Sequence, residues 1–221
     1  MDAAVVDDIK RIPAMTPSEV HEYLFRIGKA WSGKGVAMEL GAWLGASSVS
    51  LLHGLVQVGY DYPFWAFDRW WVDKEQVSKA RLQGVGLTRG ENSVNIYLNN
   101  VNPIYDDIRA VRGEIPGSLT SFTPAPIEIL IFDAPKKNPV FIDAMRYLLP
   151  YCIPGVTVIG LLDYYMYKNA DKKRQEKLEA PVRFMERFVD NFELIKDWKG
   201  YCSCAFFKYK KKIKQGELDN Y

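Results

Sequence analysis

Residues 36 to 48, VAMELGAWLGASS, decide the fold of this 221-residue chain. An apolar run that carries one acid, Glu39, leads directly into a turn with Gly41 and Gly45. Such a run predicts a buried strand that ends at the carboxyl edge of a sheet, where glycines let the backbone bend and approach a ligand. Ser47 and the serine after it then open a helix with apolar residues at helical spacing. The pattern indicates a nucleotide-cofactor turn, although such turns also occur without a ligand.

A second apolar strand ends at Asp68 in the segment PFWAFDRWW, about 30 residues, or one βαβ unit, after the first. Both oxygens of a carboxylate accept hydrogen bonds, so Asp68 is placed to bind the two ribose hydroxyls of a cofactor. The alternative is a strand-terminal aspartate that caps the next helix. The glycine spacing, E-x-G-x-x-x-G, matches neither the dinucleotide fingerprint nor a P-loop, so the turn does not predict triphosphate binding.

These features resemble the class I S-adenosylmethionine-dependent methyltransferases, in which a glycine turn follows the first strand and an acid ends the second. The resemblance continues through segments that match the third strand with its turn, the fourth strand, the fifth strand and the closing hairpin, at residues 110–115, 127–137, 155–165 and 192–210. It implies an α/β fold with a Rossmann-like seven-stranded sheet, helices on both faces and an antiparallel last strand.

The same resemblance implies S-adenosylmethionine as the cofactor. Its binding residues would be those of the two strand ends and of the turn after the third strand, namely Glu39, Gly41, Gly45, Ser47, Asp68, Gly113 and Glu114. In this arrangement Asp68 holds the ribose, and Glu114 meets the adenine edge.

Asp133 and Asp163 end the predicted fourth and fifth strands, so their carboxylates would meet in the crevice where the strand order reverses. Two neighbouring carboxylates repel each other unless a cation or a shared proton lies between them, and oxygen ligands suit Mg²⁺. The segment DAPKKNP, residues 133–139, resembles that of the metal-dependent catechol and caffeoyl-CoA O-methyltransferases. This resemblance implies Asp133 and Asp163 as metal ligands, and Asp133 and Lys136 as catalytic residues, with Lys136 taking the acceptor proton.

The third metal ligand departs from those families. The catechol-type relatives place Asp or Asn beside the second ligand, and the macrocin-type sugar O-methyltransferases carry an Asp-Asp pair, whereas this chain has Leu162 and Tyr164. Two carboxylates with waters still suffice for Mg²⁺. Two interpretations therefore stay open: a metal site, or two aspartates that order loops or bind substrate hydroxyls directly.

We expect one domain, residues 1–221, with three accessory segments. A helical cap at about 1–32 would border the cofactor pocket or a partner subunit, which leaves a homodimer open. An insert at about 69–108, with paired tryptophans, Trp70 and Trp71, and a helix from Ser93 to Ile108, is either a mobile lid or a core or dimer contact. The lysines from Lys208 onward predict a solvated basic tail at about 210–221.

Composition excludes several classes of protein. The chain is 48% hydrophobic, and its net charge of +2, from 29 basic and 27 acidic residues, does not call for nucleic acid as a partner. It has no transmembrane run, and its N-terminus lacks the features of a signal peptide, so we expect a cytoplasmic protein. Three cysteines give neither a disulfide framework nor a metal motif and are expected to be buried thiols, and both histidines are expected to be structural or on the surface.

The function that these features predict is S-adenosylmethionine-dependent O-methylation of a small-molecule hydroxyl, phenolic or sugar, with Mg²⁺ assistance open. Two alternatives remain. One is an inactive cofactor-binding or assembly protein with the same fold, and the other is an NAD-dependent oxidoreductase, against which the glycine spacing argues.

Overall fold

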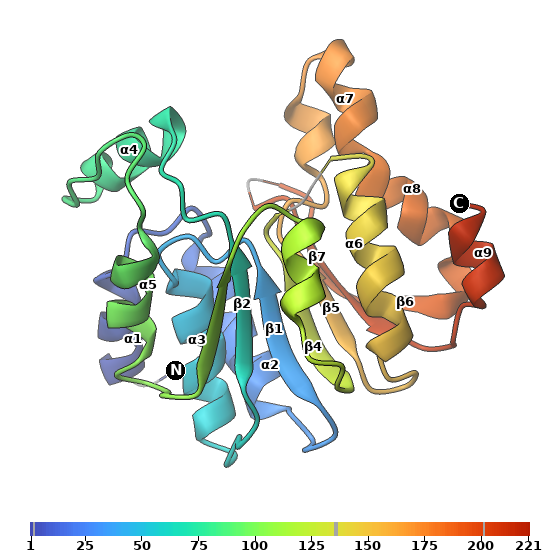
Figure 1. The fold of residues 1–221 in the computed structure, drawn as a ribbon, viewed down its shortest axis with the longest axis horizontal. Coiled ribbons are helices and arrows are strands. Elements are labelled where there is room, and N and C mark those ends of the chain that lie inside the picture. The colour runs from blue at the N-terminus through green and yellow to red at the C-terminus, as the bar shows by residue number, and fades with distance from the viewer. Residues whose placement is uncertain (2, 135–136, 201) are drawn as a thin grey trace.

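The computed structural model describes residues 1, 3–134, 137–200 and 202–221. Its centre is a seven-stranded sheet in the order β3-β2-β1-β4-β5-β7-β6 (Figure 1). The strands are β1 (Val36–Leu40), β2 (Phe64–Asp68), β3 (Ile108–Arg112), β4 (Ile127–Phe132), β5 (Val158–Leu161), β6 (Phe192–Trp198) and β7 (Cys204–Tyr209). β7 runs antiparallel to both of its neighbours, and β1 to β5 pair in parallel. The predicted sheet with its antiparallel last strand is therefore confirmed.

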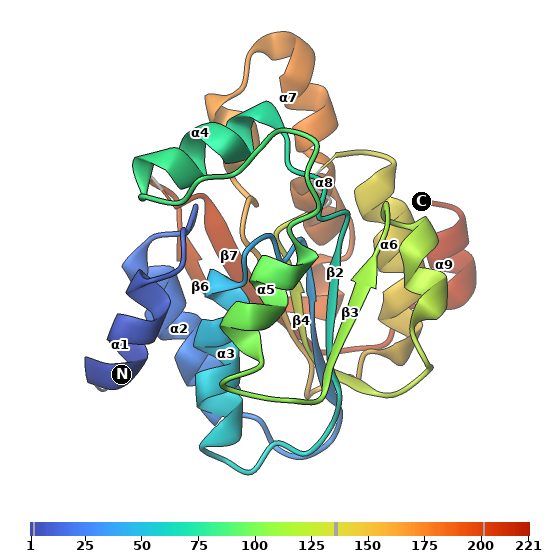
Figure 2. The ribbon, with the colours of Figure 1, turned by 60° about the vertical axis from the view of Figure 1, so that its left-hand side comes forward.

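Helices cover both faces of the sheet (Figures 1 and 2). On one face the core contains side chains of α1 (Ala3–Lys10), α2 (Ser18–Lys29), α3 (Ala46–Val56) and α5 (Val94–Val101). On the other it contains side chains of α6 (Val140–Leu148), α8 (Ala180–Arg187) and α9 (Gln215–Asp219). Every residue of β1 and β4 is buried. Their near-continuous apolar sequences follow from this, because a parallel strand covered on both faces has no polar side.

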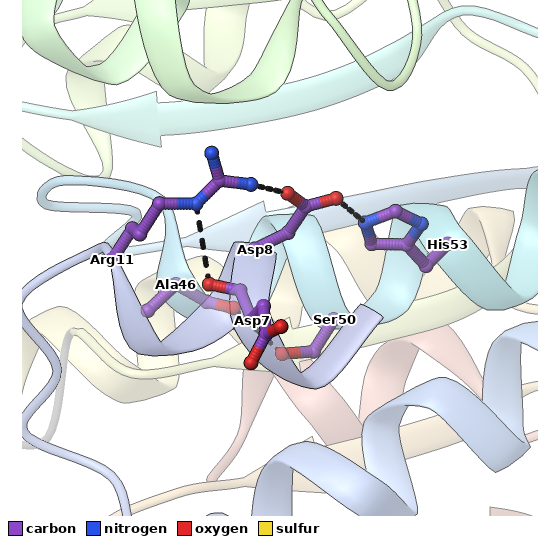
Figure 3. A network of polar contacts seen from close by, with 6 residues as sticks. All are labelled: Asp7, Asp8, Arg11, Ala46, Ser50 and His53. Carbon is purple, nitrogen blue, oxygen red and sulfur yellow. Dashed lines mark hydrogen bonds and ion pairs between the residues drawn. The ribbon is translucent and has the colours of Figure 1, made fainter. Parts of the chain in front are cut away.

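Each histidine links the helix that carries it to a neighbouring helix. His21, in α2, is buried, with Nδ1 2.8 Å from Ser50 Oγ and Nε2 3.1 Å from the carbonyl oxygen of Thr16. Burial lowers the pKa of His21 to about 4, so the ring is neutral at pH 7. His53, in α3, lies with Nε2 3.1 Å from Asp8 of α1, which also pairs with Arg11 (Figure 3). Both structural interpretations are confirmed.

The insert after β2 is more ordered than its glycines suggest. Segments 70–72 and 90–93 pair through hydrogen bonds that include Val72 N–H to Glu91 O and Ser93 N–H to Trp70 O, both 3.1 Å. Between them lies α4 (Lys74–Leu82), which the sequence analysis missed. Asp73 and Gln76 form a capping box at its start, which is a readable signal.

Two predictions about the insert are resolved. The helix expected from Ser93 to Ile108 is wrong at its end, because α5 stops at Val101 just before Pro103 and Ile108 begins β3. Trp70 is 1% exposed, and its Nε1–H donates to the Trp43 carbonyl, so the core interpretation holds for this residue. Trp71 is 52% exposed.

The basic C-terminal segment is partly packed. Its lysines at 210–212 are exposed, but Ile213 and Leu218 are buried, and α9 lies over the core at α8 and α6. The prediction of a solvated tail therefore holds for these lysines but is wrong for Ile213 and Leu218, because burying apolar side chains stabilises the folded chain. Lys208 also lies inside β7 and not after it.

Two further features complete the fold. The three cysteines are buried as thiols, as expected. Among the described residues, no helix is long and apolar enough to cross a membrane. Above the carboxyl edge of the sheet, α4 and α7 (Lys172–Leu178) project from the body of the molecule (Figure 1).

Candidate cofactor and acceptor site

The described residues of the predicted site lie at the carboxyl edge of the sheet, around the point where the strand order reverses. β1 has β2 on one side and β4 on the other, and Leu40 pairs in register with Phe67 and Phe132. Gly41 N–H donates to the Phe67 carbonyl at 2.7 Å, and Asp133 N–H donates to the Leu40 carbonyl at 2.8 Å. The ends of three strands therefore lie side by side at the topological switch point, where open α/β sheets bind their ligands.

Glu39 is a buried residue of β1 that binds the first turn of α3. It is 1% exposed, and its two carboxylate oxygens accept hydrogen bonds from the hydroxyls of Ser47 and Ser48 in the first turn of α3. Burial raises the pKa of Glu39 to about 7; the two serine hydrogen bonds oppose this shift, and the charge of Asp68 adds to it. Because Glu39 and Ser47 are committed to each other, their direct contact with a cofactor stays a prediction.

The two glycines of the turn are required by the protein itself. Gly41 has φ of +95°, and a Cβ there would lie 2.6 Å from Ala134 N, in the backbone after β4. Gly45 has φ of +96°, and a Cβ there would lie 3.1 Å from the ring of Tyr97. The sequence predicts these glycines for close approach of a ligand. The structure adds a second reason, which is close packing against β4 and α5.

Asp68 is the centre of the site. One of its carboxylate oxygens accepts the backbone N–H of Trp43 at 3.0 Å, and the other accepts that of Trp70 at 2.6 Å. Both tryptophans have positive φ, 41° and 44°, which is strained for residues with a side chain. Burial raises the pKa of Asp68, and the two backbone hydrogen bonds oppose that shift. Asp73, not Asp68, caps the following helix, so the capping alternative is wrong.

A carboxylate has about four acceptor positions, so two backbone hydrogen bonds leave Asp68 able to accept two hydroxyl groups. Part of the surface of Asp68 is also exposed. Its acceptor positions are compatible with two ribose hydroxyls, and ribose binding by Asp68 stays a prediction.

Gly113 and Glu114 lie next to Asp68. Gly113 N–H donates to the Asp68 carbonyl at 2.9 Å, and the charge of Glu114 raises the pKa of Asp68. Glu114 is exposed. The structure thus brings the two predicted adenine-side residues to the predicted ribose residue.

Asp133 and Asp163 lie near each other at the carboxyl ends of β4 and β5. Both line one small pocket between β4 and β5, together with apolar side chains that include Phe141 and Pro181. Its cavity volume is about 10 Å³, close to that of a single water. Lys136, the predicted base, lies outside the described residues.

A metal site with Asp133 and Asp163 as ligands stays a prediction. Among the described residues, no group of three His, Cys, Asp or Glu side chains could hold an ion. The neighbours of Asp163 are buried, and Tyr164 packs edge-to-face on Tyr165 and Phe207. The position that carries a ligand in the catechol-type relatives is therefore part of the core here. Two carboxylates remain, and this oxygen donor set suits Mg²⁺ only with water and substrate as further ligands.

Two residues of the site were missed by the sequence analysis. Trp43 lies in the glycine turn, but its bond to Asp68 depends on two strands pairing. Tyr97 is fully buried, and its hydroxyl lies 3.3 Å from Ser48 Oγ, next to Glu39. Burial raises the pKa of Tyr97, and the charge of Glu39 adds to this. No local signal marks Tyr97, because it comes from a helix about 50 residues further along the chain.

No protein-family model matches the chain. No characterised protein matches it in sequence either. Solved structures do match. They include an O-methyltransferase from Bacillus cereus in complex with S-adenosylhomocysteine, with 14% identity, 94% of this chain and 90% of that chain covered, and a TM-score of 0.59. The O-methyltransferase NovP has 16% identity, 87% and 79% coverage, and a TM-score of 0.61.

A third similar structure is the S-adenosylhomocysteine-bound methyltransferase PaMTH1 of Podospora anserina, with 10% identity, 96% and 89% coverage, and a TM-score of 0.58. At these identities the similarity concerns the fold alone. It extends over nearly the whole chain. The chain therefore has the fold of the class I S-adenosylmethionine-dependent methyltransferases.

Proposed function

We propose that the protein is an S-adenosylmethionine-dependent methyltransferase that methylates a hydroxyl group of a small molecule. The observation that carries the proposal is Asp68: a partly buried carboxylate at the switch point, with spare acceptor capacity, held by Trp43 and Trp70 beside the Gly41 turn. The cofactor-bound methyltransferases of the same fold support this assignment.

The cofactor supplies a methyl group on a sulfonium; the acceptor oxygen bonds to the methyl carbon as the carbon–sulfur bond breaks. The protein must then hold the reacting groups in line and remove the hydroxyl proton. Asp68 orients the nucleoside through the ribose. The fixed turn at Gly41, supported by Glu39, packs against the backbone at Ala134, so cofactor and acceptor regions adjoin.

Asp133 and Asp163 serve the acceptor in this proposal. Their carboxylates accept hydrogen bonds from its hydroxyl groups, and Lys136 or a carboxylate takes the proton. Where Mg²⁺ takes part, these two aspartates would hold it, and it would supply Lewis-acid polarisation of the acceptor oxygen. Phenolic and sugar acceptors both remain within the proposal.

The test has two parts. Calorimetric titration with S-adenosylhomocysteine and, separately, NAD distinguishes a methyltransferase from a dehydrogenase: we expect binding of the first and none of the second. Incubation with methyl-labelled S-adenosylmethionine and panels of phenols and sugars then measures transfer. Binding of NAD alone would refute the proposal. Binding of S-adenosylhomocysteine without transfer to any hydroxyl acceptor would favour the inactive cofactor-binding protein.

A further inference from the structure

A second pocket lies at the opposite edge of the sheet, and the proposed function does not use it. Its cavity volume is about 430 Å³, within the range of about 300–1,000 Å³ for small-molecule sites. It lies at the amino ends of β4 and β5, between the second half of α2 and strands β6 and β7. We call it the α2–β7 pocket. Glu128 in its wall and Asp133 in the candidate site are five residues apart on β4, which is about 16 Å along a strand.

The walls of the α2–β7 pocket are mainly apolar. Ile129 and Val158 come from the sheet, Tyr23 and Ile27 from α2, and Ile195 from β6. Tyr23 is held in place by edge-to-face contacts with Trp198 and Phe206, at centroid distances of 5.5 and 4.8 Å. Except for the exposed Ile195, these side chains already pack on the core, so this part of the wall is preformed for an aromatic or aliphatic group.

Three cations and one carboxylate line the α2–β7 pocket. Arg26, Lys34 and Lys208 line it, and Arg26 is partly neutralised by Glu22 at 2.5 Å. The lining carboxylate, Glu128, is 4% exposed and accepts backbone N–H groups of Ser32 and Lys34 at 2.5 and 2.7 Å. It is therefore already satisfied by backbone donors. Glu193 of β6 is exposed and pairs in register with Lys208, so a bound anion competes with this carboxylate for Lys208.

Lys208 is the cation best placed for a ligand. It is half-buried in β7, and its Nζ donates to the Val156 carbonyl at 2.7 Å, which fixes the ammonium at the pocket wall. An ammonium has three N–H donors, so two are left for a bound group. A partly buried, positioned cation beside an apolar wall recognises a ligand that is charged at one end.

We propose that the α2–β7 pocket binds an amphipathic organic anion: an aromatic or aliphatic body against Tyr23, Ile129 and Val158, with a carboxylate or sulfonate on Lys208. The α2–β7 pocket is separate from the candidate cofactor and acceptor site. The charge complementarity and the preformed apolar wall together select this class over neutral ligands.

The experiment compares two probes of the same shape, 2-naphthoate and 2-naphthylmethanol, by ligand-observed NMR and calorimetry. We expect the carboxylate to bind about 10-fold or more tightly than the alcohol, the effect of a charged hydrogen bond. Lys208→Met should weaken naphthoate binding by a similar factor and leave binding of the alcohol unchanged. Lys211→Met, at an exposed lysine outside the pocket, is the matched control and should change neither.

A blocking variant keeps the test independent of Lys208. Ala30 is an exposed residue of the lining at the end of α2, and Ala30→Trp should fill the mouth and abolish binding of both probes. Thermal unfolding like that of the wild type shows that each variant is folded. Three results would overturn the proposal: no binding of naphthoate, displacement of naphthoate by S-adenosylhomocysteine, or a wild-type dimer that Ala30→Trp dissociates. The last would make this face an interface between copies of the chain.

Discussion

Replacing Asp68 by Asn tests the central assignment most directly. The asparagine keeps one carbonyl oxygen, which can still accept the Trp70 N–H, but its amide group would face the Trp43 N–H, which is 3.0 Å from the native carboxylate. One charged hydrogen bond is lost, which costs about 1.5–3 kcal/mol of folding free energy. In a chain of this length, such a loss lowers Tm by roughly 3–12 °C.

The same change should weaken cofactor binding. Without the bond to Asp68, the strained Trp43 turn relaxes, and the ribose loses a charged acceptor. A loss of about 1.5–3 kcal/mol corresponds to roughly 10- to 150-fold weaker binding of S-adenosylhomocysteine. Calorimetry measures both quantities, one by thermal scanning and one by titration.

The matched control is Asp73→Asn at the start of α4. Asparagine also caps helices well, and the Arg69–Asp73 ion pair is exposed, so Tm should change by no more than about 2 °C and binding not at all. If Asp68→Asn leaves both Tm and affinity at the wild-type values, Asp68 neither holds the turn nor binds the cofactor, and the site assignment falls.

Four further predictions concern other parts of the molecule. Burial raises the pKa of Glu39 to about 7, so the stability that Glu39 contributes is present below its unfolded pKa of 4.5 and is lost as pH rises to about 7. Urea unfolding at several pH values should show this loss in the wild type and not in Glu39→Gln. An equal dependence of the unfolding free energy on pH in the two proteins would contradict it. Gly41→Ala should destabilise by about 2 kcal/mol more than Gly59→Ala, because both have positive φ but only the Gly41 Cβ meets backbone, and urea unfolding compares them. Chelation should abolish methyl transfer but spare cofactor binding if the aspartates share Mg²⁺, and full activity in excess chelator would exclude the metal. Lys136→Met should lower kcat by about 100-fold or more with cofactor affinity unchanged, whereas damage by Lys137→Met instead would shift the assignment of the base by one residue.

Much of the fold follows from local sequence patterns. The buried parallel strands are readable because both faces of β1 and β4 are covered, which forces continuous apolar runs. The positions of Asp68, Asp133 and Asp163 are readable as well, because an acid directly after such a run comes to the carboxyl edge. The helices of the insert after β2 are harder to predict. The capping box at Asp73 is a local signal for the start of α4, and the apolar pattern of α5 extends beyond its observed end at Val101.

The sequence by itself therefore determined the buried strands and the edge at which the acids lie, and its resemblance to the methyltransferases implied the antiparallel last strand. Only the tertiary structure decided what each residue touches: that Asp68 holds Trp43 and Trp70, that Tyr164 packs in the core, and that Lys208 lies in a pocket wall. The physical reason is the sequence separation over which each kind of signal acts. Hydrophobic periodicity and turn chemistry act over a few neighbouring residues, whereas these contacts join segments that only strand pairing and helix packing bring together.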